Sequence, residues 1–316
     1  MAISTLHRAK EVKDDEFYTA YEDVQKEVDH CADCFKGKTV YCPCDNPHRS
    51  NFTRYFLLNF KRLGLRRLIC TSYNSQELPL GQGGLFADKR RRGLVLDVSV
   101  GTSERRLESF IAKHVNELKG DGDFRSNECS HYFEQADAVV TNPPFSLIQP
   151  FFARVSIKQY LFICPLTALR YASVFPYIKR GLARTGYTYA SSPFIRDDGS
   201  TERLSNCVWL TNLPVDFSVR RKPECVAYNS SNYDKYDAMY QGQPILYIKS
   251  NAEIPSDYYG LMGVPITFLC DYDTSDFEVV ARTSDNKNAI RDVINGKCVF
   301  SRIIVRRHDR KKDKSV

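Results

Sequence analysis

The chain has 316 residues, 42% of them hydrophobic and 12% aromatic, which is enough to fill the core of one large domain or of a domain with a smaller partner. Its formal net charge is +7, and the excess lies in short basic clusters that suit a polyanionic partner but also fit a solvated surface. No apolar run approaches the ~20 residues needed to cross a bilayer, and the first residues lack the apolar centre of a signal peptide, so we expect a cytoplasmic protein with no membrane partner.

From residue 39 onwards, apolar runs that predict buried strands alternate with amphipathic stretches that predict helices. The predicted strands of this part are residues 39–45, 65–73, 93–100, 137–141 and 160–165. The predicted helices are residues 50–64, 102–120, 126–136, 146–155 and 166–181. This alternation predicts an α/β fold, in which helices cover both faces of a parallel sheet.

Two of the predicted helices carry clear end signals. Ser50 is a candidate N-cap for the helix over 50–64, and Gly64 ends it. The helix over 102–120 is followed by Gly120. The apolar residues that would share one face of this second helix are Leu107, Phe110, Ile111, Val115 and Leu118.

The pattern changes after about residue 187. Residues 188–213 predict strands around a turn centred on Asp198-Gly199. Beyond residue 214 the helical signal fades. The short β runs that follow are residues 244–250, 264–272, 277–284 and 298–307. We therefore expect an α/β domain over 1–213, a mixed or β-rich region over 214–305 and a basic tail over 306–316.

One predicted strand ends in an unusual way. Residues 137–146, DAVVTNPPFS, begin as a buried strand and then place two prolines and a phenylalanine directly after Asn142. Ligands of open α/β sheets bind beyond the carboxyl ends of the strands. The Asn142 side-chain carbonyl and the Pro143 main-chain carbonyl are two fixed acceptors that match the two hydrogens of one exocyclic amine. Phe145 offers a flat face to a heteroaromatic ring.

Held in this way, an aryl amine directs its lone pair at an electrophile such as the methyl group of a sulfonium. No strong base is needed, because the positive charge on sulfur drives the transfer. Orientation alone contributes up to roughly 7–11 kcal/mol in intramolecular models. Asn142, Pro143, Pro144 and Phe145 are therefore the candidate catalytic residues.

This tetrapeptide is the NPPF form of the [D/N/S]-P-P-[F/Y/W] motif of amino-methyltransferases that use S-adenosylmethionine. Alone, it leaves RNA and protein-glutamine substrates open. Seven stretches, in order along nearly the whole chain, resemble the EcoRI-type family of site-specific DNA adenine-N6 methyltransferases. They are DEFYT (15–19), VYCPCDNP (40–47), SNFTRYFLLNFKRLGL (50–65), GDGDFRS (120–126), VVTNPPFSL (139–147), NCVWLTNL (206–213) and MGVPITFL (262–269).

The resemblance implies a Rossmann-like class I methyltransferase domain over 1–213 and a target-recognition region over 214–305. It also implies S-adenosylmethionine as cofactor, double-stranded DNA as partner and N6 of a flipped-out adenine as methyl acceptor. We expect the chain to act as a monomer. An RNA or ribosomal amino-methyltransferase with the same chemistry is the alternative, and a non-catalytic nucleic-acid-binding module is a third hypothesis.

The resemblance also assigns cofactor-binding residues. Those implied are Phe17, Tyr18, Thr19, Asp45, Pro47, Asp123, Phe124 and Asn142. The residues of DEFYT would line the methionine end, and Asp123 would hold the adenine amine. Two of these assignments have structural alternatives, because Asp45-Asn46-Pro47 could be a turn before a helix cap and 120–124 could be a Gly-Asp turn.

The chain also departs from the family pattern. Residues 71–77, TSYNSQE, lack a clear match for the acid that often binds the ribose after the second strand, and 101–119 looks like extra length. Cys31 and Cys34 have zinc-like spacing, but the nearby cysteines fall in a predicted strand and the family uses no metal, so we expect none. The odd cysteine count indicates thiols that are mostly reduced and buried. Trp209 could stack on the target base, but its strand favours a core position.

A basic segment lies on the chain between the second and third predicted strands. We expect Arg90, Arg91 and Arg92 to bind DNA phosphates without reading bases, because their loop returns to the sheet edge that carries NPPF. The basic tail is a weaker candidate, since charged termini are usually solvated.

Overall fold

The structure is a computed structural model. It describes residues 19–74, 92–190, 194–195, 201–202, 206–214, 226–271, 276–283 and 292–308. The chain forms two compact units. Unit 1 comprises the described residues within Met1–Pro165 and Gly186–Val215, and unit 2 those within Leu166–Thr185 and Asp216–Val316. Two separate stretches of the chain therefore form unit 2. The sequence analysis did not predict that Leu166–Thr185 belongs to it.

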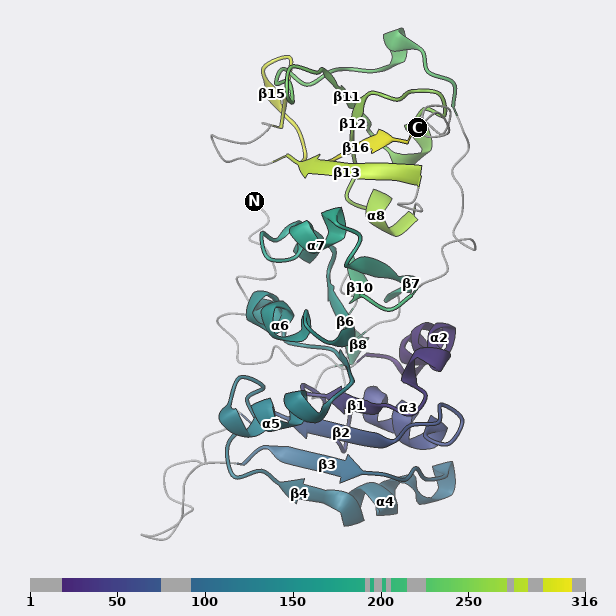
Figure 1. Cartoon of the computed structure of the whole chain (residues 1–316), viewed down its shortest axis with the longest axis vertical. Coiled ribbons are helices and arrows are strands. Elements are labelled where there is room, and N and C mark those ends of the chain that lie inside the picture. The colour runs from purple at the N-terminus through teal and green to yellow at the C-terminus, as the bar shows by residue number, and fades with distance from the viewer. Residues whose placement is uncertain are drawn as a thin grey trace, which may run out of the picture. The chain divides into compact units, whose positions relative to one another are not determined.

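Unit 1 is built on an eight-stranded sheet with the order β4-β3-β2-β1-β5-β6-β10-β7 (Figure 1). Its strands are β1 (Thr39–Cys42), β2 (Arg67–Ser72), β3 (Leu94–Val98), β4 (Val115–Glu117), β5 (Ala138–Thr141), β6 (Gln159–Pro165), β7 (Arg184–Ala190) and β10 (Cys207–Thr211). The central strands β2, β1, β5 and β6 are parallel, whereas β10 runs antiparallel to β6. The expected α/β fold of the class I methyltransferase type is confirmed.

The expectation of a purely parallel sheet is wrong at one edge, where β3 pairs antiparallel with β2 and β4 antiparallel with β3. A parallel partner for β2 would need a crossover connection, usually a helix. The sequence between Ser72 and Leu94 is rich in glycine and basic residues and has no amphipathic period. A segment of this composition predicts no crossover helix, and β3 accordingly runs beside β2 in the opposite direction.

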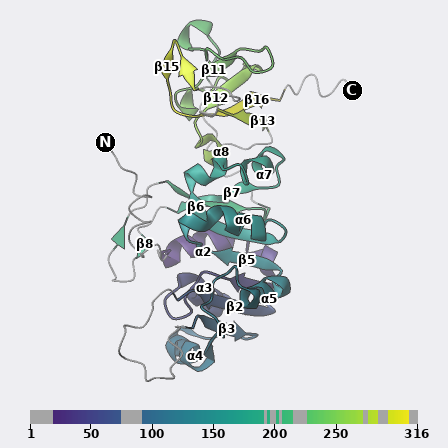
Figure 2. The same cartoon turned by 90° about the vertical axis from the view of Figure 1, so that its left-hand side faces the viewer.

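Helices cover both faces of this sheet (Figure 2). They are α2 (Tyr21–His30), α3 (Asn51–Asn59), α4 (Leu107–His114), α5 (Asn127–Gln135) and α6 (Ile148–Val155). Residues of α2, α3 and α4 pack with Val40 and Cys42 of β1 on one face. On the other face, Tyr41 packs edge-on against Phe133 of α5. Alternate residues of β1 thus face opposite layers, as the two-residue period of a strand requires.

The start signal of α3 is confirmed, whereas its end signal and the signals of α4 are only partly right. Ser50 caps α3 by accepting a hydrogen bond from Phe52 N at 3.1 Å. The helix ends at Asn59, before a turn that closes at Gly64 with a φ of +61°. The helix predicted over 102–120 ends at His114. Val115 takes an extended backbone and starts β4, because its main chain pairs with Leu96 at the open edge of β3.

Trp209 is a core residue, as its strand favours. Its side chain is fully buried, and its ring packs edge-on against Phe52 of α3 at 5.9 Å between centroids. All ten cysteines within the described ranges are free thiols, and seven of them are buried. In this part of the chain, no helix is long and apolar enough to span a membrane.

A buried carboxylate fastens α2 to the edge strand β7. Glu27 of α2 is 2% exposed. Its side chain accepts hydrogen bonds from Tyr187 N and Thr188 N of β7, both at 2.7 Å, and from the Thr188 hydroxyl at 2.7 Å. Because several donors compensate the buried charge, Glu27 fixes the position of α2 against β7.

Unit 2 contains a four-stranded sheet with the order β11-β12-β16-β13 and a small β14–β15 hairpin. Its elements are α7 (Phe175–Lys179), β11 (Ile245–Tyr247), β12 (Leu261–Val264), α8 (Phe268–Asp271), β13 (Phe277–Arg282), β14 (Val293–Ile294), β15 (Lys297–Cys298) and β16 (Ile303–Arg307). The predicted tail overlaps this sheet, because Arg306 and Arg307 complete β16. Beyond 308 the tail lies outside the described residues.

Two further predictions need correction. The strand expected over 264–272 is mostly wrong, because Phe268–Asp271 forms α8 after a turn in which Phe268 N donates to Pro265 O. The helix expected over 166–181 is divided into a 3-10 helix (Leu166–Arg170) and α7. Pro176 lies at the start of α7, where its missing N–H costs nothing, and it could not continue an earlier helix.

The hairpin expected around Asp198-Gly199 is matched by its arms. β8 (Phe194–Ile195) and β9 (Thr201–Glu202) pair antiparallel, with Phe194 opposite Glu202. The turn itself lies outside the described residues.

Candidate active site

The strand order places a ligand site at the carboxyl ends of β1 and β5. The chain passes from β1 to β2 on one side and later returns to β5 on the other side, so the crevice between β1 and β5 is a topological switch point. Ligands of open α/β sheets bind at such points. Two loops leave the sheet here, 43–50 after β1 and 142–147 after β5.

Asp45 joins the loop after β1 to the neighbouring strands β2 and β5. Its carboxylate is buried and accepts hydrogen bonds from Ser50 Oγ at 2.6 Å and from Thr141 Oγ1. Its main-chain N donates to Thr71 O of β2 at 2.9 Å. These contacts give Asp45 a structural role in the turn before α3, and Pro47 is also buried within that turn. A cofactor would meet the main chain of this loop more readily than the Asp45 carboxylate.

The NPPF motif leads directly from β5 into α6. Asn142 is half-buried with its Oδ1 atom enclosed, and Pro143 is buried. Leu147 N donates to Pro144 O at 2.9 Å, so this turn uses the carbonyl one residue after Pro143. Phe145 is half-buried and rests on the apolar core beneath α2, α3 and α4. The motif is therefore a fixed turn with one aromatic side chain partly open.

A third loop, 120–124, is pressed against the end of β2. Gly122 has a φ of +82°, and a Cβ on it would collide with the Ser72 carbonyl oxygen. A Cβ on Gly93 would lie 2.6 Å from Gly122 Cα. Asn74 N also donates to Asp121 O at 2.9 Å. Only glycine allows this approach, and the loop therefore reaches the same sheet edge as the loops after β1 and β5.

Asp123 lies in this loop as a half-buried ionised acceptor. It accepts hydrogen bonds from Arg125 N at 2.8 Å and from Arg125 Nη2 at 2.6 Å. The hydrogen bond from the Arg125 guanidinium holds the pKa of Asp123 below its ordinary value. Phe124 is buried and meets Phe151 of α6 edge-on at 5.4 Å, so the loop is tied to the helix that follows NPPF. The turn interpretation of 120–124 is correct locally and is compatible with a binding role.

The sequence analysis did not single out two residues at this end of the sheet. Arg125 follows Asp123 by two residues, a spacing that carries no recognisable signal. Tyr73 stands at the end of β2, where methyltransferases often carry a ribose-binding acid, and it is 47% exposed. A search for a carboxylate at that position could not have found it.

The remaining predicted residues are only partly within reach. Thr19 is buried just before α2; its main-chain O accepts from Asn51 Nδ2 at 2.8 Å, and its Oγ1 has no hydrogen-bond partner in the described chain. Phe17 and Tyr18 lie outside the described residues, as do Arg90 and Arg91.

Arg92 lies at the carboxyl end of β2. Its main-chain O accepts from Asn74 Nδ2 at 3.4 Å, and its guanidinium is half-exposed, 3.9 Å from Glu117. It therefore returns to the sheet edge that carries the 120–124 loop. For Arg92 this is the expected position, and its binding to DNA phosphates stays a prediction.

The cysteines for which no metal is expected belong to different elements. Cys31 ends α2 and is buried, and burial raises the pKa of its thiol well above the ordinary value. Cys42 is enclosed within β1, where burial also raises its pKa. Over the described ranges, no three His, Cys, Asp or Glu side chains are grouped to hold a metal ion.

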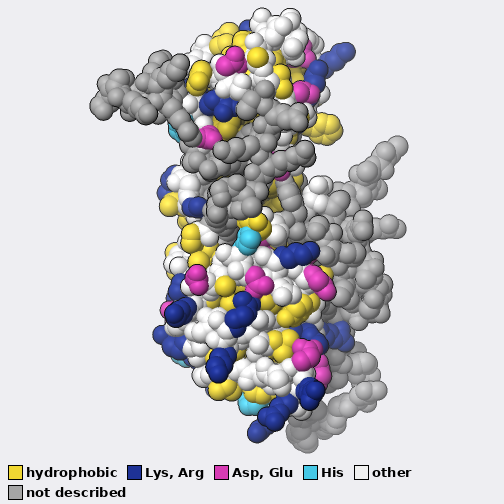
Figure 3. All heavy atoms as spheres, turned by 90° about the vertical axis from the view of Figure 1, so that its right-hand side faces the viewer, with side chains coloured by type: hydrophobic (Ala, Val, Ile, Leu, Met, Phe, Trp, Pro, Cys, Tyr) yellow, Lys and Arg dark blue, Asp and Glu magenta, His cyan; other side chains and the backbone are white. Residues whose placement is uncertain are grey.

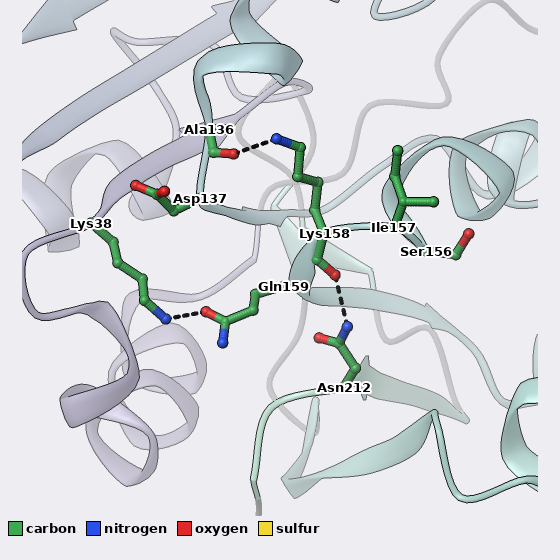
Figure 4. Close-up of a pocket in the computed structure, with 8 residues that line it drawn as sticks. All are labelled: Lys38, Ala136, Asp137, Ser156, Ile157, Lys158, Gln159 and Asn212. Carbon is green, nitrogen blue, oxygen red and sulfur yellow. Dashed lines mark hydrogen bonds between the residues drawn. The ribbon is translucent and has the colours of Figure 1, made fainter.

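A polar depression lies at the opposite edge of the sheet, near the amino ends of β1, β5 and β6 (Figure 4). Its cations already have partners within the protein. Lys38 Nζ donates to Gln159 Oε1, and Lys158 Nζ donates to Ala136 O at 2.9 Å. Asn212 Nδ2 bonds Lys158 O at 2.7 Å. These contacts hold the amino ends of the strands in place. The candidate active site therefore lies at the carboxyl ends of the strands.

Comparison with known proteins agrees with this geometry. The chain is 34% identical to the Type II methyltransferase M.EcoRI of Escherichia coli, with 95% of each chain covered. It is 31% identical to M.MgeORF184P of Mycoplasma genitalium, over 96% of this chain and 98% of the relative. It is 30% identical to M.MpnI of Mycoplasma pneumoniae, over 87% and 84%. No solved structure matches the chain. The family model described as adenine-specific methyltransferase EcoRI matches residues 5–314, and the chain therefore belongs to the EcoRI family of adenine-specific methyltransferases.

Proposed function

We propose that this protein transfers a methyl group from S-adenosylmethionine to N6 of an adenine in a specific short sequence of double-stranded DNA. The observation that carries the proposal is the meeting of NPPF and the Asp123 loop at one sheet edge, in a chain of the adenine-specific methyltransferase family. NPPF offers hydrogen-bond acceptors for the amine of the target adenine. The Asp123 loop offers a carboxylate for the adenine amine of the methyl donor.

The residues of the sheet edge fit S-adenosylmethionine. Bound there, this cofactor supplies an electrophilic methyl group on a sulfonium. Asp123 would accept from the adenine amine, a role that suits a carboxylate whose pKa is already lowered by Arg125. Phe124 would support this loop from the core. Thr19 would place its buried hydroxyl toward the methionine end, where a donor or acceptor satisfies it.

Asn142 and Pro143 would orient the target amine. Each contributes one carbonyl acceptor, so together they hold both N–H groups and favour the pyramidal amine whose lone pair points at the methyl group. Phe145 would stack on the adenine ring with the face it does not press against the core. The protein needs no general base, since the proton can leave after the bond to carbon has formed.

A base inside a duplex cannot reach a site of this kind without leaving the stack, at a cost of a few kcal/mol. Arg90 to Arg92 would offset part of that cost by binding phosphates, and unit 2 would read the sequence. On the face shown in Figure 3, basic side chains are interspersed with acidic ones, as on a solvated surface. Charge on that face alone does not mark the DNA side. We further propose that one copy of the chain suffices.

The test is methylation-sensitive sequencing of DNA from cells that express the wild-type chain or Asn142→Ala. We expect N6-methyladenine at one short motif with the wild type and almost none with the variant, while both proteins bind S-adenosylmethionine. Asn116→Ala is the matched control, because it removes an exposed asparagine from the edge strand β4. Methylation of RNA and not of duplex DNA by the purified wild type would replace the proposal with the RNA alternative.

A further inference from the structure

Unit 2 carries two narrow antiparallel ribbons, residues 235–246 and 292–300, which we call the ribbon pair. The first turns at Gln241-Gly242, with φ of +50° and +75°, and is closed by two hydrogen bonds of 3.0 Å between Tyr240 and Gln243. The second turns at Asn295-Gly296, with φ of +50° and +73°, between β14 and β15. Two central residues of positive φ define the tight turns that suit the twist of a hairpin.

Asp237 fastens one ribbon to the other. Its main-chain N donates to Val293 O at 3.0 Å. Its two carboxylate oxygens accept from Asn295 N at 2.7 Å and Gly296 N at 2.9 Å, at the tip of the second ribbon. Both ribbons also rest on one small apolar core, to which Tyr236 and Ile294 belong. The second tip is therefore held in place before any ligand arrives.

The ribbon pair exposes both amide side chains and large apolar side chains. Gln241 and Asn295 are exposed at the two tips. Met239, on the first ribbon, is 64% exposed, and Phe300, at the end of the second, is 84% exposed. The two ribbons therefore present amide and apolar side chains to solvent, where a partner can contact them.

We infer that the ribbon pair enters the major groove and reads base edges. This inference rests on the proposed function. A two-stranded ribbon fits the major groove, and the amide of glutamine or asparagine matches adenine N6 and N7 with two hydrogen bonds. Gln241 and Asn295 are thus the specificity residues, and Met239 and Phe300 contact thymine methyl groups. Asp237 is a positioning residue, because it acts through the second tip.

The test replaces each amide by glycine, which keeps the positive φ of the turn and removes only the side chain. Gln241→Gly, Asn295→Gly and the control Asn232→Ala, which removes an exposed asparagine elsewhere in unit 2, are compared with the wild type. For each protein, kcat/KM is measured on a duplex with the sequence that the wild-type protein methylates and on duplexes that differ from it by one base pair. Affinity for S-adenosylmethionine and the melting temperature report the fold and the cofactor site.

We expect each glycine variant to lose roughly 5- to 150-fold in discrimination at one position of the motif, as expected when a two-point base contact is removed. Cofactor affinity and melting temperature should stay at wild-type values, and Asn232→Ala should discriminate like the wild type. Glycine variants that keep full discrimination would overturn the inference while leaving the proposed function intact. A wild-type chain that methylates no duplex DNA would overturn both.

Discussion

Gly122 makes the closest backbone approach at the candidate active site, and alanine at this position tests whether the approach positions Asp123. A Cβ would collide with the Ser72 carbonyl oxygen and lie 3.1 Å from Gly93 Cα. The left-handed backbone, at φ +82°, costs an alanine roughly 1–2 kcal/mol by itself. The obstacle is backbone at the end of a central strand, so the 120–124 loop has to move.

That movement breaks two of the hydrogen bonds that hold the loop, Asn74 N to Asp121 O and Gly93 N to Gly120 O, with lengths of 2.9 and 2.8 Å. Each contributes about 0.5–1.5 kcal/mol. Gly37 is the matched control, since its φ is +70° but a Cβ there meets nothing within 4 Å. Gly37→Ala carries the backbone strain alone. We therefore expect Gly122→Ala to lower the free energy of unfolding by about 1–3 kcal/mol more than Gly37→Ala.

Urea unfolding followed by circular dichroism measures this difference, and calorimetric titration measures the affinity for S-adenosylmethionine. We expect Gly122→Ala to weaken cofactor binding, because Asp123 moves with its loop, and Gly37→Ala to leave it unchanged. Equal losses of stability in the two variants, together with wild-type cofactor affinity in Gly122→Ala, would refute the reasoning.

Further predictions concern single side chains. Asp123→Ala should weaken S-adenosylmethionine binding by roughly 10- to 150-fold in calorimetry, the range for a hydrogen bond to a charged group. The hydrogen bond from Arg125 lowers the pKa of Asp123 in the folded protein. The stability that this carboxylate contributes is therefore present above the ordinary pKa of about 3.9 and is lost as the pH falls through the folded pKa. In acid titrations, Arg125→Ala should shift this loss of stability to higher pH. Phe145→Ala should lose about 1–3 kcal/mol of base stacking, reported by a fluorescent adenine analogue, and Phe145→Trp should lose less; equal signals would make Phe145 a packing residue. Alanine at Arg90 to Arg92 should weaken cognate and non-cognate DNA alike and flatten the plot of log K against log salt by about 0.9 per lost phosphate contact, and an unchanged slope would exclude this segment. Glu27→Gln should cost about 1–3 kcal/mol in thermal unfolding, since one buried acceptor becomes a donor facing an N–H, and a wild-type melting temperature would count against the anchor.

Sequence reasoning succeeded where the signal is local. The start of α3 needs only Ser50, whose side chain caps the first turn of the helix. The NPPF turn is likewise encoded by neighbouring residues, because proline limits its own backbone and that of the residue before it. A short sequence window contains all of this information.

The misses depend on partners that are distant in the sequence. Val115 leaves the helical pattern because the edge of β3 offers main-chain hydrogen bonds, and no feature of 102–120 announces that edge. The contact of Gly93 with Gly122 exists only once two loops have met at the end of β2. The reversed direction of β3 was readable in principle, since the sequence before it has no amphipathic helical period.

The path of Leu166–Thr185 limits how this protein can be divided. This segment leaves β6, joins unit 2 and returns to β7, so cutting the chain near residue 215 would not release a complete catalytic half. It would strand Arg170, whose guanidinium bonds Thr283 O at 2.5 Å, and Thr185, whose hydroxyl bonds Leu269 O at 2.8 Å. A chimera that exchanges recognition regions between relatives therefore has to exchange two separate segments of the chain. An exchange of the C-terminal segment alone would pack it against a Leu166–Thr185 segment from another protein.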